Sequence, residues 1–337
     1  MNLKTKITEI HYDKNASGFF IKFLEFASIF YALASGFKNK LYDSNIIKPQ
    51  KVDAFVVSIG NLTTGGVGKT PVVAQFAKYF IAKGEKTAII SRGYGGKLSN
   101  KNINVISDGE NVFYNARLAG DEPFWLSKNV KGAIVITSKN RYKAAKYAVE
   151  NFGVTKIILD DGFQHRKLHR DLDIVLIDSE KILGNEKLLP AGPLREGKEA
   201  FSRIDKLVIV SKNTDHTRAE KLAKVMSKRL NLKTFLCKTE PDYVYNIKTG
   251  TTLENDSDII AISAIGQPEQ FYKFLSNYNI KQTLSFDDHH SYTESEIPTG
   301  TVVTTEKDAV KMQNFNREDI YALKLKTEID VTSVLSD

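Results

Sequence analysis

An early segment of the chain is strongly apolar. Between residues 19 and 37 most side chains are aromatic or aliphatic, and the few polar or small residues recur at helical spacing. This narrow polar stripe consists of Lys22, Glu25, Ser28, Ala32 and Ser35. At ~1.5 Å per residue a helix over this segment is ~28 Å long, close to the thickness of a bilayer core. The pattern therefore predicts one long amphipathic helix.

Charged residues indicate how this helix meets a membrane. Lys22 and Glu25 lie inside the segment, and lysines flank both of its ends. Internal charge disfavours a helix that spans the bilayer, and it also disfavours a cleaved secretory signal with a short apolar core. We expect a helix that lies in the membrane interface, with aromatic rings in the acyl boundary and lysines near the head groups. Burial of the helix against the rest of the protein is the alternative.

After Pro49 short β-rich runs alternate with stretches of helical periodicity. The expected strands are 54–59, 87–90, 133–136, 156–159, 173–177 and 207–210, and the clearest helices are 141–152 and 217–230. Short apolar strands separated by helices are typical of a parallel sheet that is covered on both faces.

Four parts of the chain follow from these patterns. Residues 1–45 are the N-terminal helical segment, and residues 46–235 are the parallel-sheet α/β domain. The pattern weakens from about residue 233, which favours a β-hairpin linker over 236–254. Strand and helix signals then resume, and they predict a second, smaller α/β domain over 255–337.

The composition narrows the class of protein only modestly. The 337 residues are 42% hydrophobic, which is enough for folded cores and unlike a disordered, coiled-coil or collagen-like chain. The single cysteine, Cys237, excludes an internal disulfide and a zinc site made of cysteines alone, and it favours a reducing compartment. With 48 Lys and Arg against 40 Asp and Glu, the net charge of +8 favours an acidic partner: nucleic acid, anionic lipid or a phosphorylated small molecule.

A glycine-rich loop, residues 60–71, lies between an expected strand and an expected helix. Glycines let backbone N–H groups curl around phosphate oxygens, and the helix N-terminus adds partial positive charge. In this pattern Lys69 reaches the β- and γ-phosphates, and the Thr70 hydroxyl is a ligand for Mg²⁺. Thr63 stands where the strict motif has glycine. The expected nucleotide contacts are Thr63, Thr64, Gly65, Gly66, Val67, Gly68, Lys69 and Thr70.

A second element completes a nucleotide site. The apolar run 156–159 leads directly into Asp160 and Asp161. A buried strand that ends in carboxylates is the form of the element that fixes Mg²⁺ beside a phosphate loop, so we expect Asp160 and Asp161 to be metal ligands. Simple turn residues are the alternative for the two acids.

Seven short strings, in order along the chain, resemble one family, the tetraacyldisaccharide 4′-kinases of lipid A synthesis. The strings are residues 61–71, 91–96, 120–123, 160–165, 189–196, 286–290 and 305–309. The phosphate loop alone is unspecific, but the ordered set spans most of the chain and is specific to this family.

The resemblance implies an activity and a place in the cell. The family uses ATP, with Mg²⁺, to phosphorylate the 4′-hydroxyl of a tetraacylated glucosamine disaccharide 1-phosphate, and the product is lipid IVA. The family also has a membrane-associated N-terminal helix, which matches residues 19–37, and a smaller second α/β lobe. It further implies a peripheral or monotopic protein at the cytoplasmic face of the inner membrane.

The resemblance also suggests roles for individual residues. Asp121 matches the acidic position and is the expected base for the sugar hydroxyl, although Asp-Glu-Pro is also a common helix start. His289 matches the histidine that partners this base, with Asp288 orienting it; a surface histidine is the alternative. His290 ranks second for that role.

Further candidates carry less specific signals. Glu122 is a candidate Mg²⁺ ligand through water, and Arg92 is a candidate contact for the transferring phosphoryl group or the 1-phosphate of the substrate. A plain surface arginine is the alternative for Arg92, and Lys307 and Arg195 share this ambiguity. His165 is expected to be structural or to face the substrate rather than act as a base.

Two other classes of protein compete with a lipid kinase. A regulatory P-loop GTPase or ATPase is the main rival, yet residues 207–213 lack a clean Asn-Lys-x-Asp, and Thr64 stands where the partitioning type has its signature lysine. A nucleic-acid binder is suggested by charge alone. Because the basic residues are dispersed and no RNA or DNA motif is present, we expect no nucleic-acid partner.

Overall fold

The computed structural model describes residues 3–99, 101–213, 215–266, 268–287 and 290–336. One sheet of twelve strands runs through them in the order β10-β9-β11-β12-β8-β7-β6-β1-β5-β2-β4-β3. Neighbouring strands are parallel except for the pairs β12–β8 and β4–β3. The strands are β1 (Phe55–Asn61), β2 (Thr87–Ser91), β3 (Asn104–Asp108), β4 (Ile134–Thr137), β5 (Lys156–Asp160), β6 (Leu172–Asp178), β7 (Lys206–Ser211), β8 (Thr234–Asn246), β9 (Asp258–Ser263), β10 (Asn279–Ser285), β11 (Val302–Thr305) and β12 (Ile320–Ile329).

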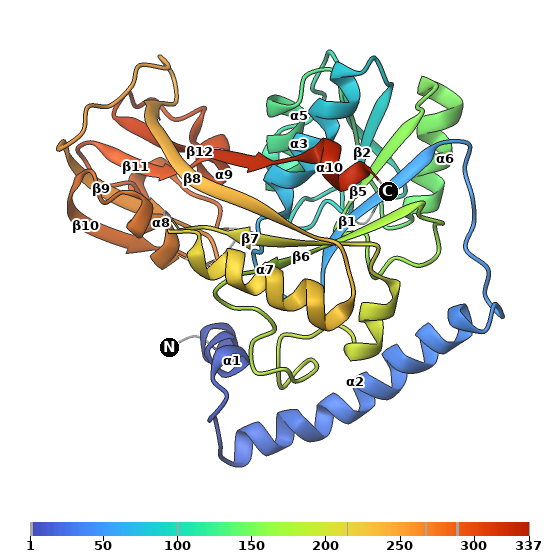
Figure 1. Cartoon of the computed structure of the whole chain (residues 1–337). Coiled ribbons are helices and arrows are strands. Elements are labelled where there is room, and N and C mark those ends of the chain that lie inside the picture. The colour runs from blue at the N-terminus through green and yellow to red at the C-terminus, as the bar shows by residue number, and fades with distance from the viewer. Residues whose placement is uncertain (1–2, 100, 214, 267, 288–289, 337) are drawn as a thin grey trace.

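Helices surround this sheet, and one long helix lies apart from it along the lower edge of Figure 1. The helices are α1 (Leu3–Tyr12), α2 (Phe19–Asp43), α3 (Lys69–Ala82), α4 (Ala116–Ala119), α5 (Asp121–Asn129), α6 (Arg141–Phe152), α7 (Thr217–Leu230), α8 (Pro268–Phe274), α9 (Glu306–Met312) and α10 (Val331–Leu335), with short 3-10 turns η1 (Lys198–Arg203) and η2 (Glu294–Glu296). The expected α/β fold with a parallel sheet is confirmed.

The main lobe comprises β1–β7 with α3–α7, and the second lobe comprises β9–β11 with α8 and α9. The main lobe has a hydrophobic core on each face of its sheet. Side chains alternate along a strand, so Val57 of β1 packs with α3 and α5 on one face while Val56 packs with α6 on the other. The same alternation divides Ile89 and Ile90 of β2. Because both faces are covered, these strands read as continuous apolar runs in the sequence.

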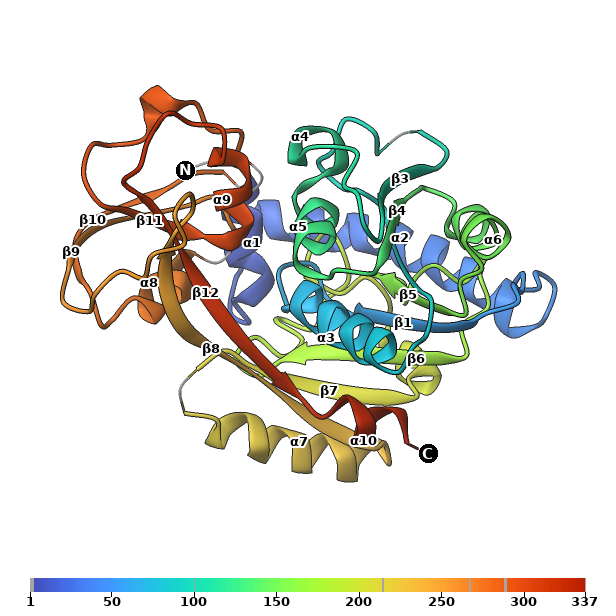
Figure 2. The same cartoon turned by 90° about the horizontal axis from the view of Figure 1, so that it is seen from above.

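The segment expected as a β-hairpin linker, residues 236–254, has a different structure. Most of it belongs to β8, which pairs with β7 on one side and with β12 on the other. Only a tight turn after Asn246 brings Thr252 back to pair with Tyr245. Seen from above, β8 and β12 cross diagonally from one lobe to the other (Figure 2), so the two lobes share one continuous sheet.

The last residues of the chain return to the main lobe. β12 runs out of the second lobe, and α10 follows it to pack against α3. Val331 and Val334 of α10 are buried in the same core as Val57. Lys206 of β7 donates to the carbonyl oxygen of Ser336 at 2.9 Å. The expected smaller domain over 255–337 therefore contributes its end to the core of the main lobe.

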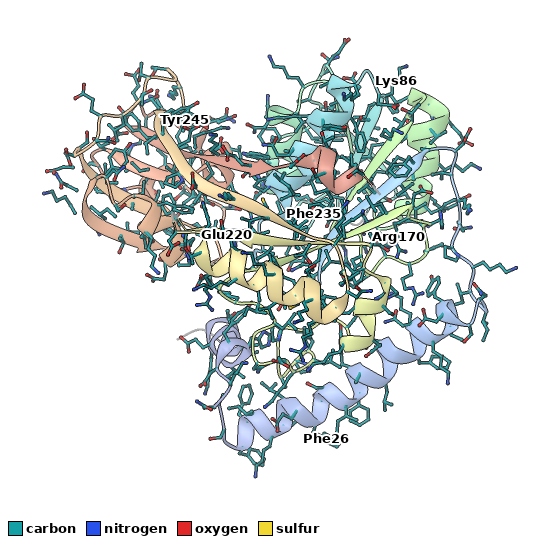
Figure 3. All side chains as sticks on the ribbon, viewed as in Figure 1. Phe26, Lys86, Arg170, Glu220, Phe235 and Tyr245 are labelled. Atoms are coloured by element: carbon teal, nitrogen blue, oxygen red, sulfur yellow. The ribbon has the colours of Figure 1, made fainter. Side chains whose placement is uncertain are left out.

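α2 presents two unlike faces. Six large apolar residues on one face are 59–91% exposed: Phe19, Phe23, Phe26, Phe30, Leu33 and Phe37. Figure 3 shows Phe26 projecting away from the rest of the protein. The opposite face carries the polar stripe, where Glu25 pairs with Lys187 and Ser28 donates to the carbonyl oxygen of Leu188. By length and composition α2 is the one described helix apolar enough to cross a membrane, and 11% of its apolar window is buried. It is therefore not a core helix.

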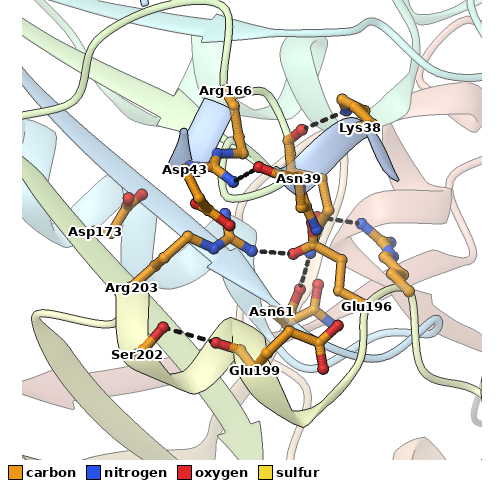
Figure 4. A network of polar contacts seen from close by, with 12 residues as sticks. Lys38, Asn39, Asp43, Asn61, Arg166, Asp173, Glu196, Glu199, Ser202 and Arg203 are labelled. Atoms are coloured by element: carbon orange, nitrogen blue, oxygen red, sulfur yellow. Dashed lines mark hydrogen bonds and ion pairs between the residues drawn. The ribbon is translucent and has the colours of Figure 1, made fainter. Parts of the chain in front are cut away.

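Polar contacts fasten the end of α2 to the main lobe (Figure 4). Asn39 donates to Oε1 of Glu196 at 2.9 Å, and Arg203 pairs with the other oxygen of the same carboxylate at 2.5 Å. Lys38 donates to the carbonyl oxygen of Gln164 at 3.1 Å. The loops of Glu196 and Gln164 also reach the phosphate loop, because Gln164 donates to the carbonyl oxygen of Asn61 and the N–H of Arg195 donates to that of Leu62. The end of α2 is therefore anchored close to the phosphate loop.

Candidate active site

The phosphate loop lies where the sequence predicts it. β1 ends at Asn61, and α3 begins at Lys69 after Gly68, whose φ of 96° is a conformation that favours glycine. Gly60 is required for a different reason, because a Cβ there would lie 2.6 Å from Cβ of Phe163. Lys69 donates to Oδ1 of Asn61 at 2.9 Å, which holds its side chain back along the loop.

Residues distant in the sequence brace this loop. Thr64 donates its N–H to the carbonyl oxygen of Pro193 at 2.8 Å, and the Tyr12 hydroxyl donates to the carbonyl oxygen of Thr64 at 3.2 Å. Lys212, at the end of β7, bridges the carbonyl oxygen of Gly66 and the carboxylate of Asp178. Sequence reasoning missed Tyr12 and Lys212, because only the fold brings them to the loop.

The two acids at the end of β5 lie beside the phosphate loop in different environments. Ile59 of β1 is the register partner of Asp160, which ends β5. Burial, with Glu122 nearby, holds the pKa of Asp160 well above its usual range. Its Oδ1 has no hydrogen-bond partner among the described residues. Burial also acts to raise the pKa of Asp161, but Lys69 and Arg195 outweigh it and lower that pKa to about 2.

Ion pairs explain the low pKa of Asp161. Nη1 of Arg195 lies 2.8 Å from each oxygen of this carboxylate, and Nζ of Lys69 lies 3.5 Å from Oδ1. Asp161 itself has a φ of 56°, so it turns sharply out of the strand. Arg195, which the sequence left ambiguous, thus links residues 189–196 to the acidic pair.

Arg141 is a functional candidate that sequence reasoning missed. It opens α6 just beyond the carboxyl end of β4 and is 7% exposed. Burial lowers its pKa, whereas Asp161 and Asp160 act in the opposite direction. Its Nε has no hydrogen-bond partner among the described residues. The signal that could have found it is a basic residue at the carboxyl end of a parallel strand, the edge where α/β proteins bind ligands.

Asp121 lies at the start of α5, where the loop 91–96 packs against it. A Cβ on Gly96 would lie 2.5 Å from the backbone nitrogen of Gly120, so this contact requires glycine. Asp-Glu-Pro does start a helix here: the N-cap of α5 is Gly120, and Asp121 is the first helical residue, one position after the cap. Asp121 is 8% exposed and pairs with Lys311 of the second lobe at 3.1 Å.

The remaining candidates lie around this position. Glu122 pairs with Lys307 at 3.7 Å, so two residues left open by the sequence meet across the lobes. Arg92 is exposed and close enough to Arg141 to influence its pKa. Asp288 and His289 lie outside the described residues. The ring of His290 stacks on Phe286 and pairs with Glu296 at 3.3 Å, a contact within the second lobe.

The residues present suit Mg²⁺ bound together with a nucleotide. Among the described residues no group of three His, Cys, Asp or Glu could hold a metal ion. Mg²⁺ beside a triphosphate needs only one or two protein ligands, because phosphate oxygens and water complete its shell. The unpartnered, buried Oδ1 of Asp160 is a hard oxygen of this kind.

A strand, a phosphate loop and a helix, beside a neighbouring strand that leads into two adjacent acids, define a P-loop protein that binds a nucleoside triphosphate. The family model for tetraacyldisaccharide-1-P 4′-kinase matches residues 20–337. The chain belongs to this kinase family.

Individual relatives agree with this assignment. A tetraacyldisaccharide 4′-kinase of Halothermothrix orenii is 37% identical over 310 residues, which cover 83% of this chain and 79% of the relative. The Syntrophus aciditrophicus enzyme of the same name is 32% identical over 336 residues, covering 93% and 90% of the two chains. The crystal structure of LpxK from Aquifex aeolicus, described as an "apo" form in complex with ATP, matches with a TM-score of 0.76 and 32% identity over 94% of this chain and 96% of that one.

Proposed function

We propose that this kinase transfers the γ-phosphate of ATP to the 4′-hydroxyl of a tetraacylated glucosamine disaccharide 1-phosphate, giving lipid IVA. The observation that carries the proposal is the phosphate loop with Lys69 beside the two acids at the end of β5, in a chain 37% identical to a kinase named for this substrate. That the Aquifex aeolicus relative was solved with ATP supports the choice of phosphate donor. A regulatory GTPase or ATPase is not favoured, because the relatives across the whole chain are kinases.

The phosphate loop and its lysine bind and orient the nucleotide. Backbone N–H groups of residues 65–70 bind phosphate oxygens at the N-terminus of α3, while the N–H of Thr64 holds the loop to Pro193. We assign Lys69 to the β- and γ-phosphates. When ATP binds, the Lys69 ammonium group exchanges its contacts with Asn61 and Asp161 for contacts with phosphate oxygens. Arg92 and Arg141 supply further positive charge toward the transferring group. Charge neutralisation of this kind is the main contribution of protein groups to phosphoryl transfer.

Mg²⁺ supplies charge neutralisation of the phosphates when it is bound. Asp160 and the Thr70 hydroxyl are the residues that would hold it, with Glu122 acting through water. Asp161 was an equal candidate from the sequence, but its ion pairs with Arg195 and Lys69 suit a role in holding those two cations. Asp160 is therefore the carboxylate that we assign to the metal.

Asp121 acts as the base. As the bond between the 4′-oxygen and the γ-phosphorus forms, the bond from that phosphorus to the β–γ bridging oxygen breaks, and ADP leaves with the electron pair. The hydroxyl proton passes to the carboxylate of Asp121. Its burial at the start of α5 and its contact with the second lobe support this choice. His289 remains the proposed partner of this base.

The lipid substrate and the membrane meet the protein at α2. Its exposed phenylalanines match the acyl chains of a membrane interface, and the polar stripe holds the helix on the main lobe. We propose a peripheral or monotopic protein at the cytoplasmic face of the inner membrane, where ATP and the disaccharide lipid are both available.

A direct assay tests the choice of acceptor. Purified protein is incubated with Mg²⁺ and γ-labelled ATP in the presence of disaccharide monophosphate lipid, of glycerol or of a protein mixture. We expect label only in the disaccharide lipid. Label in glycerol or in protein, with none in the lipid, would assign the chain to another class of kinase.

A further inference from the structure

Lys311 lies at the contact between the two lobes. It extends from α9 of the second lobe, and its side chain is only 10% exposed. Its Nζ is 3.1 Å from Oδ2 of Asp121 and 3.2 Å from Oδ1 of Asp308, and it donates to the carbonyl oxygen of His290 at 3.0 Å. An ammonium group has three protons, and three acceptors surround this one. One cation therefore joins the start of α5 to a helix and a loop of the second lobe.

Asp308 holds the side chain of Lys311 in position. This carboxylate is fully buried, and its Oδ2 accepts from the N–H of Ala264 and from the Thr305 hydroxyl, both at 2.9 Å. Thr305 also caps α9 by accepting from the N–H of Asp308. Thr305, Asp308 and Lys311 are three residues apart in turn, so they share one face of the helix. The cap, the buried acid and the lysine form a single rigid unit.

We infer that Lys311 is a positioning residue for the phosphoryl transfer, which holds the Asp121 carboxylate in place across the boundary between the lobes. The inference rests on the proposed role of Asp121 as base. Asp121 belongs to the main lobe, whereas the groups that orient the Lys311 side chain belong to the second lobe. The position of the second lobe therefore sets the position of the Asp121 carboxylate through the ammonium group of Lys311. Without it, the carboxylates of Asp121 and Asp308 face each other unneutralised, and Asp121 turns away from its working position.

Three lysine variants test this role. Lys311→Met should lower kcat by about 10- to 100-fold, because misplacing a reacting group by about 1 Å costs this much. The KM values for ATP and for the lipid should stay within about twofold, because neither substrate is bound by the lysine. Lys311→Arg keeps the charge and should recover part of the lost kcat. Lys324→Met is the matched control, since Lys324 pairs with Glu306 at 2.7 Å inside the second lobe, and it should keep the wild-type kcat.

Asp121→Ala, measured in parallel, separates the two claims. If Asp121→Ala is inactive while Lys311→Met has the wild-type kcat, the inference about Lys311 is overturned and the proposed base stands. If Asp121→Ala keeps the wild-type kcat, both claims fall. A higher KM at unchanged kcat in Lys311→Met would also overturn the inference, because it would show a structural role alone. Should Lys311→Met fail to fold, Lys311→Gln replaces it as the uncharged variant: a wild-type kcat in Lys311→Gln overturns the inference, and a lowered kcat at unchanged KM supports it.

Discussion

Asp160 and Asp161 are neighbours in the sequence, yet their surroundings give them opposite properties. Burial and Glu122 keep the pKa of Asp160 high, and no described residue bonds its Oδ1. Lys69 and Arg195 overcome burial at Asp161 and keep it ionised. Two carboxylates in different environments can perform two tasks. Here Asp160 is suited to bind a metal ion, and Asp161 is suited to hold the side chains of Lys69 and Arg195.

Lys69 is the side chain that we assign most directly to the phosphates of ATP. Lys69→Ala should lower turnover by at least about 100-fold, because removing one preorganised positive group from a phosphoryl-transfer site has an effect of this size. Steady-state kinetics measures it, and circular dichroism verifies that the variant is folded. Lys78→Ala is the control, because Lys78 lies on the exposed side of the same helix. Wild-type turnover in Lys69→Ala would contradict the role of the phosphate loop.

His165 predicts a pH dependence of stability. Burial, and then Arg141, lower its pKa from 6.5 to about 4 in the folded protein. Between these two values the unfolded chain binds the proton and the folded chain does not, so unfolding becomes more favourable as the pH falls from about 6.5 toward 4. His165→Gln removes this contribution. Thermal melting at pH 7 and pH 5 should show a smaller drop in Tm for the variant than for the wild type. Equal drops would show that His165 does not contribute.

At the scale of elements, α2 combines a face that binds the main lobe with a face that no described residue covers. The polar stripe seen in the sequence turns out to face the protein rather than solvent, through Glu25 and Ser28. The phenylalanines at spacings of three and four residues are left on the outside. Because its polar side is bound to the main lobe, α2 keeps its aromatic side exposed on the outside of the protein.

This exposed stripe predicts membrane binding. The double variant Phe23→Gln and Phe30→Gln should lower the fraction of protein that co-sediments with anionic vesicles, because each ring contributes buried apolar area at the interface. Its melting temperature should not change, since both rings are exposed in the protein alone. Val225→Gln on α7 is the control, an equally exposed apolar residue on another helix. Unchanged vesicle binding by the double variant would contradict the interface helix.

The elements that the sequence predicts correctly are those with a strong local pattern. β1, β5 and β6 are buried on both faces and read as apolar runs, and α6 and α7 match the expected 141–152 and 217–230. β8 and β12 were missed because their pairing joins segments far apart in the chain and leaves many residues half-exposed. The hairpin expected over 236–254 is limited to the turn that brings Thr252 back against Tyr245, because β8 pairs with β7 and β12 along most of its length.

The residues of the candidate site likewise fall into those that could be predicted from the sequence and those that could not. That Lys69, Asp160 and Asp161 lie together was predictable, because their places follow from a strand, a loop and a helix, whereas the ion pairs that distinguish Asp161 from Asp160 were not. Arg141 and Lys311 could not be predicted as site residues, because the acids that they face lie far away in the sequence and only the fold brings them close. The loop 189–196 is intermediate: its motif was visible, but the pairing of Arg195 with Asp161 was not.

At the scale of the whole molecule, the two lobes are parts of one sheet and not separate units on a flexible linker. β8 and β12 carry the sheet from lobe to lobe, and α10 closes onto the core of the main lobe. Asp121, Lys311, Glu122 and Lys307 then meet where α5 faces α9. The proposed chemistry lies at this junction, with α2 anchored beside the phosphate loop.

The most direct measurement follows the labelled γ-phosphate of ATP into the disaccharide lipid with wild-type protein and with Asp121→Ala. Mild acid hydrolysis removes the 1-phosphate and leaves the 4′-phosphate, so the position of the label can be read. We expect the wild type to place label at the acid-stable 4′ position, and Asp121→Ala to bind ATP normally yet lose transfer by about 100-fold or more. Wild-type transfer by Asp121→Ala, or label released by mild acid, would contradict the account.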